Sequence, residues 1–316
     1  MSQEPARHDV TFLSEQKRIQ AWHYLPQSAA MTHAGGAPVV VMAHGLSMTR
    51  DSGLAPYAER FAAAGMHVVV FDYRCFGDSE GTPRDLVSVH QQVADYHAAL
   101  AFARSLPGVD RERVALWGTS YSGGIATQCA YEDGGVQALV VQVPNLDNAA
   151  TGWFMALHLT RTAPLRGLWL CAQAVRDTAA GWFGRAPVYV QALGAVGAGA
   201  AYENDESMAN VEKMRGPSWH NRLALRDFTR LPLFRPIKHA KELPCRVHIV
   251  AVDRDDLTPV GPALRLAELL GERAELHRYP VGHFGVYTGA LFEDVVAKQT
   301  DFLVRELSAG AQRQVA

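Results

Sequence analysis

A serine on a glycine-rich turn is the first group in this sequence that could do covalent chemistry. It is Ser120, in the stretch WGTSYSGG (117–124). The apolar run 114–117 before it predicts a short buried strand, and residues 125–131 after it predict a helix. A serine on such a strand-to-helix turn presents its Oγ above the sheet, beside the free N–H groups of the helix. The stretch therefore predicts a nucleophile in a G-x-S-x-G pattern, with Ser122 at the last position, although an ordinary Gly/Ser turn has a similar composition.

A serine hydroxyl is an effective nucleophile only when a base takes its proton, and a carboxylate must orient that base. Candidate groups follow the last two predicted strands: Asp253, Asp255 and Asp256 after one, and His283 after the other. We expect them near Ser120, because open α/β sheets hold their ligands at the carboxyl ends of the strands. The order serine, aspartate, histidine is the one expected with this kind of turn. Of thirteen histidines, His283 is singled out by its Gly-His-Phe step after the last strand, whereas the three aspartates all compete.

The elements that must position these groups alternate between strands and helices. Residues 9–13 and 18–24 predict an opening hairpin. Thr82 and Asp85 resemble a capping box at the start of a helix. The other predicted strands are 38–43, 66–73, 114–117, 136–143, 246–252 and 272–279, and the predicted helices are 54–64, 85–105, 125–131, 262–270 and 291–307. Repeated strand–helix units predict an α/β fold with a mostly parallel central sheet and helices on both faces.

The alternation stops after Pro144 and resumes near residue 236. Residues 145–235 have no clear strand pattern and hold four of the six tryptophans. We therefore predict a core made of residues 1–144 and 236–316, with a mainly helical cap, 145–235, inserted into it. The aromatic side chains of the cap either form its own core or line a pocket above Ser120. The candidates for such a pocket are Trp153, Phe154, Trp182 and Phe183.

Composition and charge exclude several classes of function. A net charge of −2 over 316 residues gives no electrostatic basis for binding nucleic acid or an anionic membrane. No segment reaches the roughly 18 apolar residues needed to span a bilayer, and residues 1–12 contain no apolar leader. The four cysteines form no C-x-x-C pair, which favours reduced thiols in a cytoplasmic protein. We expect a small-molecule substrate, no nucleic-acid or membrane partner, and possible assembly into a homo-oligomer.

The sequence resembles the α/β-hydrolase superfamily, in particular the serine esterases and peptidase-like enzymes related to dienelactone hydrolases and S15 peptidases. The matching stretches are AHGLSMTRD (43–51), FDYRCFGDSEG (71–81), WGTSYSGG (117–124), DRDDLTP (253–259) and GHFGVYTG (282–289). The resemblance implies the α/β-hydrolase fold and no metal or organic cofactor. In the family's acid loop the catalytic aspartate lies four residues before the proline, which selects Asp255. The resemblance also implies an oxyanion hole formed by the backbone N–H groups of Leu46 and Tyr121.

The expected chemistry is acyl transfer through an acyl-enzyme. Ser120 attacks a carbonyl carbon, His283 takes and returns the proton, and Asp255 fixes the histidine tautomer. Water then releases the acyl group, so we expect a serine hydrolase for a carboxylic ester, thioester or lactone. The alternatives are an acyltransferase that uses the same triad with another acceptor, and a non-catalytic small-molecule binder. The cap's arginines are too scattered to predict an anion clamp, which favours neutral, apolar acyl groups.

Overall fold

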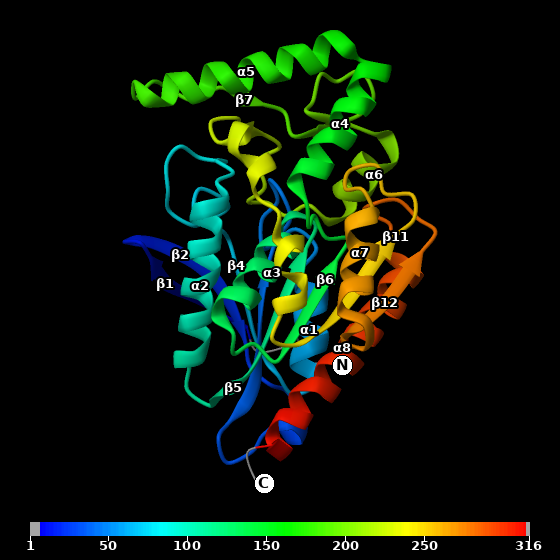
Figure 1. Cartoon of the computed structure of the whole chain (residues 1–316). Helices are drawn as coiled ribbons and strands as arrows, with labels where there is room; N and C mark the ends of the chain where they lie inside the picture. The colour runs from blue at the N-terminus through cyan, green and yellow to red at the C-terminus, as the bar shows by residue number, and fades with distance from the viewer. Residues whose placement is uncertain (1–6, 314–316) are drawn as a thin grey trace.

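An eight-stranded sheet runs through the middle of the molecule (Figure 1). The computed structural model describes residues 7–313; the first six, part of the stretch expected to lack a leader, lie outside it. The order is β1-β2-β4-β3-β5-β6-β11-β12, with β1, β2 and β4 antiparallel in succession and the other neighbours parallel. The strands are β1 (Arg7–Ser14), β2 (Lys17–Tyr24), β3 (Ala37–Ala43), β4 (His67–Phe71), β5 (Val109–Thr119), β6 (Ala138–Gln142), β11 (Arg246–Val252) and β12 (Ala274–Tyr279).

Helices cover both faces of this sheet, as the alternating pattern predicts (Figure 1). Successive residues of a strand point to opposite faces. Val39 and Val41 of β3 accordingly pack in one core with α2, α3 and α7, whereas Val40 and Met42 pack in the other with α1 and α8. The helices are α1 (Ala55–Ala63), α2 (Val89–Ser105), α3 (Tyr121–Asp133), α7 (Gly261–Leu270) and α8 (Gly289–Arg313), with 3₁₀ turns η1 (Ala29–Met31), η3 (Pro236–Glu242) and η4 (Gly271–Arg273).

The helix predicted from residue 85 begins later, at Val89, so Thr82 and Asp85 do not form a capping box. Asp85 has φ of 56°, a left-handed conformation that cannot belong to a right-handed helix. Its carboxylate binds the Arg222 side chain instead, with Nε 2.6 Å from Oδ2. The acidic side chain therefore ties the loop before α2 to the segment inserted after β6.

That inserted segment lies above the carboxyl ends of the strands, with α4 and α5 uppermost (Figure 1). It comes between β6 and β11 in the chain. We propose its division from the core at residues 145–235. Its elements are α4 (Asn148–Thr162), α5 (Pro164–Trp182), α6 (Asp205–Met214), η2 (Phe228–Leu233) and the short strands β7 (Tyr189–Val190), β8 (Leu193–Gly194), β9 (Tyr202–Glu203) and β10 (Leu223–Ala224). Over residues 7–313, the helices are all too short or too polar to cross a bilayer.

Candidate active site

Ser120 lies on a strained turn between β5 and α3. Its φ of 54° and ψ of −122° are unusual for a residue with a side chain. Small neighbours make this turn possible. A Cβ on Gly118 would come within 2.3 Å of the Ser122 carbonyl oxygen, and one on Gly124 within 2.2 Å of the Asn145 carbonyl oxygen. The glycines of the motif are thus required by the close approach of backbone to backbone.

Ser122, which replaces the last glycine of the G-x-S-x-G pattern, is buried in the first turn of α3. Its Oγ donates to the Ala43 carbonyl oxygen at 2.7 Å and accepts from the Thr119 N–H at 3.1 Å. The side chain therefore links the turn to the end of β3. It points into the protein, and among the described residues its Oγ hydrogen-bonds to these two backbone groups alone.

The structure brings Ser120, His283 and Asp255 together in one hydrogen-bonded chain. His283 Nε2 lies 3.0 Å from Ser120 Oγ, and its Nδ1 lies 2.8 Å from Asp255 Oδ2. The imidazole side chain is 1% exposed and the carboxylate 4%, so both are shielded from solvent. The Asp255 carboxylate also accepts backbone N–H groups, from Leu257 at 3.0 Å and from Thr258 at 2.7 Å. These bonds hold the carboxylate in the orientation that a histidine base needs.

The two competing aspartates of the same loop have other partners. Asp253 points to the surface and accepts from the Arg278 guanidinium at 2.6 Å and 2.9 Å. Asp256 accepts from the Asn204 side-chain amide at 2.5 Å. Of the three carboxylates, Asp255 is the one in contact with His283.

The loop after β3 passes directly beside Ser120. A Cβ on Gly45 would lie 3.3 Å from Ser120 Cβ, and the Met48 N–H closes a turn onto the Gly45 carbonyl at 3.2 Å. Leu46 lies in this turn and lines the same cavity as Ser120. Tyr121 is the first residue of α3, so its backbone N–H has no acceptor within the helix. Both N–H groups thus belong to backbone that borders the nucleophile.

His44, just before this loop, is fully buried, and both of its ring nitrogens lie within hydrogen-bond distance of backbone groups. Its Nδ1 lies 2.9 Å from the Gly45 carbonyl oxygen, and its Nε2 accepts the Tyr73 N–H at 3.3 Å. Burial lowers the pKa of this imidazole, which favours its neutral form. Both ring nitrogens are therefore occupied in shaping the loop.

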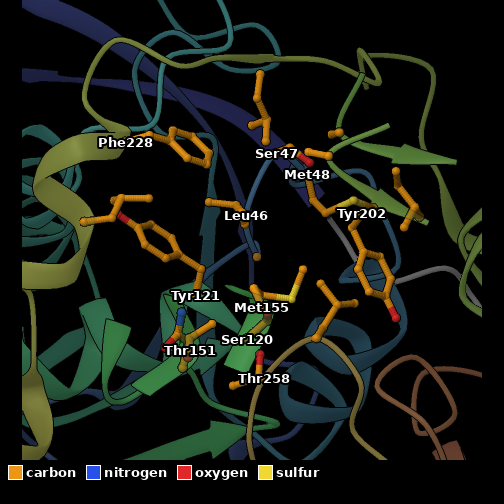
Figure 2. Close-up of a pocket in the computed structure, with 18 of the residues that line it drawn as sticks. Leu46, Ser47, Met48, Ser120, Tyr121, Thr151, Met155, Tyr202, Phe228 and Thr258 are labelled. Carbon is orange, nitrogen blue, oxygen red and sulfur yellow. Dashed lines mark hydrogen bonds between the residues drawn. The ribbon is translucent and has the colours of Figure 1, made fainter. Parts of the chain in front are cut away.

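A cavity of about 600 Å³ opens above Ser120 (Figure 2). This volume lies within the usual range for small-molecule sites. Figure 2 shows Leu46, Tyr121 and Met155 around the same space as Ser120. The cavity wall comes from the β3 loop, α4, α5 and the segments that follow. Among the described residues, those that line it include no Asp, Glu, Lys or Arg side chain.

The aromatic residues predicted to line the pocket do not line it. Trp153 is 68% exposed, Trp182 is 75% exposed and Phe183 is 79% exposed, and Phe154 is also absent from the cavity wall. For Trp153 the cause is helix geometry, because positions two apart on an α-helix differ by about 200° in direction. Met155 of α4 faces the cavity, and its neighbour at 153 therefore faces away.

The residues that do line the upper cavity are mostly aliphatic or sulfur-containing. They follow helical spacing, with Gly152, Met155 and Leu159 on α4, and Leu170, Cys171, Ala174 and Val175 on α5. The sequence feature that identifies these cavity-lining residues is their spacing of three and four within the cap, and the size of the side chains does not identify them. Tyr287 is a further wall residue that the sequence analysis missed. Its hydroxyl bonds the Thr119 hydroxyl beside the nucleophile turn, and burial raises its pKa to about 12.

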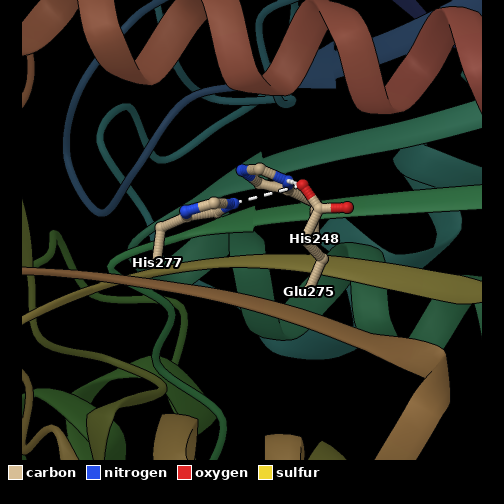
Figure 3. Close-up of side chains that lie close together, drawn as sticks. All are labelled: His248, Glu275 and His277. Carbon is tan, nitrogen blue, oxygen red and sulfur yellow. Dashed lines mark hydrogen bonds and ion pairs between the residues drawn. The ribbon is translucent and has the colours of Figure 1, made fainter.

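His248, Glu275 and His277 form a second cluster of titratable groups, between β11, β12 and α8 (Figure 3). Their potential metal-ligand atoms all lie within 4.8 Å of one another. The Glu275 carboxylate already has protein partners, with Arg305 Nη2 at 2.5 Å and His277 Nε2 at 3.1 Å. The cluster packs under α8, where Phe302 contacts the His248 ring, and not at the carboxyl ends of the strands. We therefore give it no part in the chemistry at Ser120.

Buried His248 should make the protein less stable in mild acid. Burial lowers its pKa to about 4 in the folded state, against an ordinary value near 6.5, despite the Glu275 carboxylate nearby. Between these two pKa values, His248 is protonated in the unfolded state and neutral in the folded state. The free energy of unfolding therefore falls as the pH drops from about 6.5 to about 4, by up to about 1.4 kcal/mol per pH unit. Urea unfolding at a series of pH values measures this. His248→Gln should have a flatter dependence, and equal slopes in the two proteins would contradict the assignment.

Residues 15–229 of the chain match the family described as X-Pro dipeptidyl-peptidase (S15 family). The chain is also 35% identical over 299 residues to the quorum-quenching protein AidA of Acinetobacter baumannii, covering 94% of each. It is 27% identical to the thiohydrolase aneE of Aspergillus aculeatus, covering 86% of each.

Among solved structures, the fold is similar to that of the α/β hydrolase GrgF from Penicillium sp. sh18. The TM-score is 0.77 at 23% identity, with 96% of this chain and 99% of the other covered. The same relative carries the name polyketide transferase. These likenesses agree with the α/β-hydrolase resemblance that the sequence motifs indicated.

Proposed function

The chain belongs to the S15 family of α/β-hydrolases, and from this premise we propose that it is a serine hydrolase that cleaves neutral, largely apolar carboxylic esters or thioesters. The observation that carries the proposal is the position of Ser120. Its Oγ stands at the floor of a large cavity and within hydrogen-bond distance of a histidine that contacts a buried carboxylate. This is the arrangement that forms and breaks acyl-enzymes.

In the proposed mechanism, Ser120 Oγ attacks the carbonyl carbon while His283 Nε2 takes its proton. Asp255 holds the Nδ1 proton and stabilises the imidazolium. The oxyanion is bound by the backbone N–H groups of Leu46 and Tyr121, each contributing about 3 kcal/mol to the transition state. The imidazolium then protonates the leaving alcohol or thiol. A water molecule, deprotonated by His283, attacks the acyl carbon and frees Ser120.

The character of the cavity wall selects the substrate class. A dipeptidyl-peptidase must bind the charged amino terminus of a peptide, and the described residues of this wall include no carboxylate to pair with it. An anionic acyl group would likewise lack a cationic partner. The wall does offer neutral polar atoms: the Asn148 amide and Trp219 Nε1 are buried and have no hydrogen-bond partner among the described residues. An apolar acyl chain with neutral hydrogen-bonding groups fits this combination.

The activity on p-nitrophenyl esters should rise with acyl chain length and then fall. Each added methylene that is buried contributes up to about 0.8 kcal/mol, or about fourfold in kcat/KM, until the cavity is full. We expect an increase from acetyl to at least octanoyl, with poor activity on anionic acyl groups. Met155→Trp, which fills the cavity from α4, should move the optimum to shorter chains. Trp153→Ala, on the exposed side of the same helix, should leave it unchanged, and a profile that peaks at acetyl would contradict the proposal.

Acyl transfer to another acceptor is the second candidate, because a relative of this fold carries the name polyketide transferase. The same acyl-enzyme serves both reactions, and only the acceptor differs. Product analysis with an added alcohol or amine separates them: a hydrolase still gives mainly free acid, whereas a transferase gives mainly the new ester or amide.

We also propose that the protein acts in the cytoplasm on a small-molecule substrate. The cysteines support a reducing compartment, since Cys75, Cys129, Cys171 and Cys245 are all unpaired thiols. Fractionation of cells that produce the protein, with activity measured in each fraction, tests this location.

A further inference from the structure

The outer side of α5 has a long row of apolar side chains in contact with solvent. Leu165 is 82% exposed, Leu168 is 70% exposed, Val175 is 62% exposed and Trp182 is 75% exposed. In Figure 1, α5 lies at the outermost edge of the molecule, on the side away from the sheet. Its opposite side, with Leu170 and Ala174, packs against the protein and lines the cavity. The helix is therefore apolar on both sides, and one of them is uncovered.

The exposed row has the spacing of a helix-packing seam. Its members are the exposed Leu165, Leu168, Ala172, Val175 and Trp182 and the half-buried Ala179, in alternating steps of three and four residues. This 3.5-residue repeat keeps a stripe facing a second helix along its whole length and is the pattern of coiled coils. A lipid surface does not require it, because a membrane accepts any broad apolar face. The spacing thus points to a helix as the occupant.

The seam is complementary to itself when a second copy runs antiparallel. With a two-fold axis between Gln173 and Ala174, Leu168 lies opposite Ala179, and Ala172 lies opposite Val175. A large side chain then meets a small one at each of these two levels, as close packing of two helices requires. Leu165 and Trp182 face each other at both ends of the seam. A two-fold contact uses the same patch on both copies, and this patch has the required symmetry.

Charge and area agree with this arrangement. Arg166 turns away from the seam to an ion pair with Glu203 at 2.6 Å. The same axis places Arg176 opposite Cys171, so neither arginine of α5 meets its own copy. With Trp169 and Phe183, which are 47% and 79% exposed, the face offers on the order of 700 to 1,000 Å² of apolar surface per copy, judged from typical side-chain areas. A standard protein–protein interface buries about 800 Å² per partner. Patches of this size on a monomer mark interaction sites.

We propose that α5 pairs with α5 of a second copy of this chain, antiparallel across a two-fold axis, and that this seam is the dimer interface. The proposal goes beyond the proposed function and does not depend on it. It has a consequence for the cavity, because Val175 belongs both to the exposed seam and to the cavity wall. The second copy therefore closes the outer side of the cavity at this position.

Light scattering after size-exclusion chromatography measures the assembly directly. The wild-type protein at micromolar concentration should have twice the mass of the chain. Leu168→Glu should be monomeric, with dimer affinity lowered by on the order of 100-fold, because a carboxylate is buried opposite Ala179. Leu13→Glu is the matched control: Leu13 lies on β1, is 67% exposed and should leave the dimer intact. Circular dichroism verifies that both variants are folded, as expected for exposed positions.

A wild-type monomer, or a Leu168→Glu protein that still dimerises with unchanged affinity, would overturn the proposal. So would a wild-type monomer that binds anionic lipid vesicles through Leu168, because the face would then serve a membrane. Cross-linking tests the register. Copies with Ala172→Cys and Val175→Cys, differently tagged and co-expressed in a Cys171→Ser background, should form a mixed disulfide on oxidation. The same experiment with Leu13→Cys as one of the two copies should yield none, and absence of the 172–175 product would exclude this register.

Discussion

Replacing Ser120 with alanine should lower kcat for ester hydrolysis by about 10⁵- to 10⁶-fold and abolish labelling by a fluorophosphonate probe. The expected loss is this large because His283 and Asp255 act only through the serine hydroxyl. Alanine removes Oγ, the atom 3.0 Å from His283 Nε2, and leaves the backbone groups that border it. The fold should be retained, since within residues 7–313 the bond to His283 is the one side-chain hydrogen bond of Ser120.

Ser122→Ala is the matched control, two residues away on the same turn. Its Oγ points into the protein, so this variant should keep most of the activity and be labelled at Ser120. Its stability should fall by about 1 to 3 kcal/mol, because the Ala43 carbonyl oxygen and the Thr119 N–H lose their partner. A peptide map that finds the probe on Ser122 would show that the wrong serine has been assigned.

The three groups of the candidate triad could be placed together from sequence because each follows the end of a strand in the parallel part of the sheet. Parallel strands end at a common edge, so residues far apart in the chain are brought together by topology alone. Ser120, Asp255 and His283 follow β5, β11 and β12, which are neighbours or near neighbours in the sheet. The choice among three aspartates needed more than topology, and the family resemblance supplied it. In the structure, Asp255 is the one that contacts His283.

The cavity wall was not predictable in the same way. A helix of the inserted segment has an apolar face toward the core. It can have a second apolar face on its outer side, where a partner covers that side. Trp153 and Trp182 are large and apolar, yet they lie on exposed sides, while the smaller Met155 and Ala174 face the cavity. Which side of a helix is inward depends on how it docks, and side-chain size carries no such information.

The start of α2 shows a second limit of sequence reasoning. Local spacing suggested a cap at Asp85, but this residue forms an ion pair with Arg222, 137 residues further along the chain. A long-range charge pair competes with local capping for the same carboxylate, and here the pair is formed. Which of the two interactions Asp85 forms can be decided only when the position of the inserted segment, which carries Arg222, is known.

Asp255→Asn should lower kcat by about 10⁴-fold while leaving the protein folded. Asp255 Oδ1 accepts two backbone N–H groups, from Leu257 and Thr258, and an asparagine must place its carbonyl oxygen there to keep those bonds. Its NH₂ group then faces His283 Nδ1 where Oδ2 now accepts. The imidazole must respond by carrying its proton on Nε2, and a protonated Nε2 cannot take the proton of Ser120. The loss therefore comes from the wrong tautomer in an otherwise intact site.

The neighbouring aspartates provide matched controls for this effect. Asp253→Asn removes one partner of an exposed ion pair with Arg278, which contributes at most about 1 kcal/mol to stability and nothing to the orientation of His283. Asp256→Asn retains an oxygen that can accept from Asn204 and should also keep most of kcat. Steady-state kinetics on one ester compares the three variants. A severe loss in Asp256→Asn with a mild one in Asp255→Asn would contradict the assignment. It would mean that Asp256 takes the place of Asp255 during catalysis, and that the contact between Asp255 and His283 is not the one that orients the base.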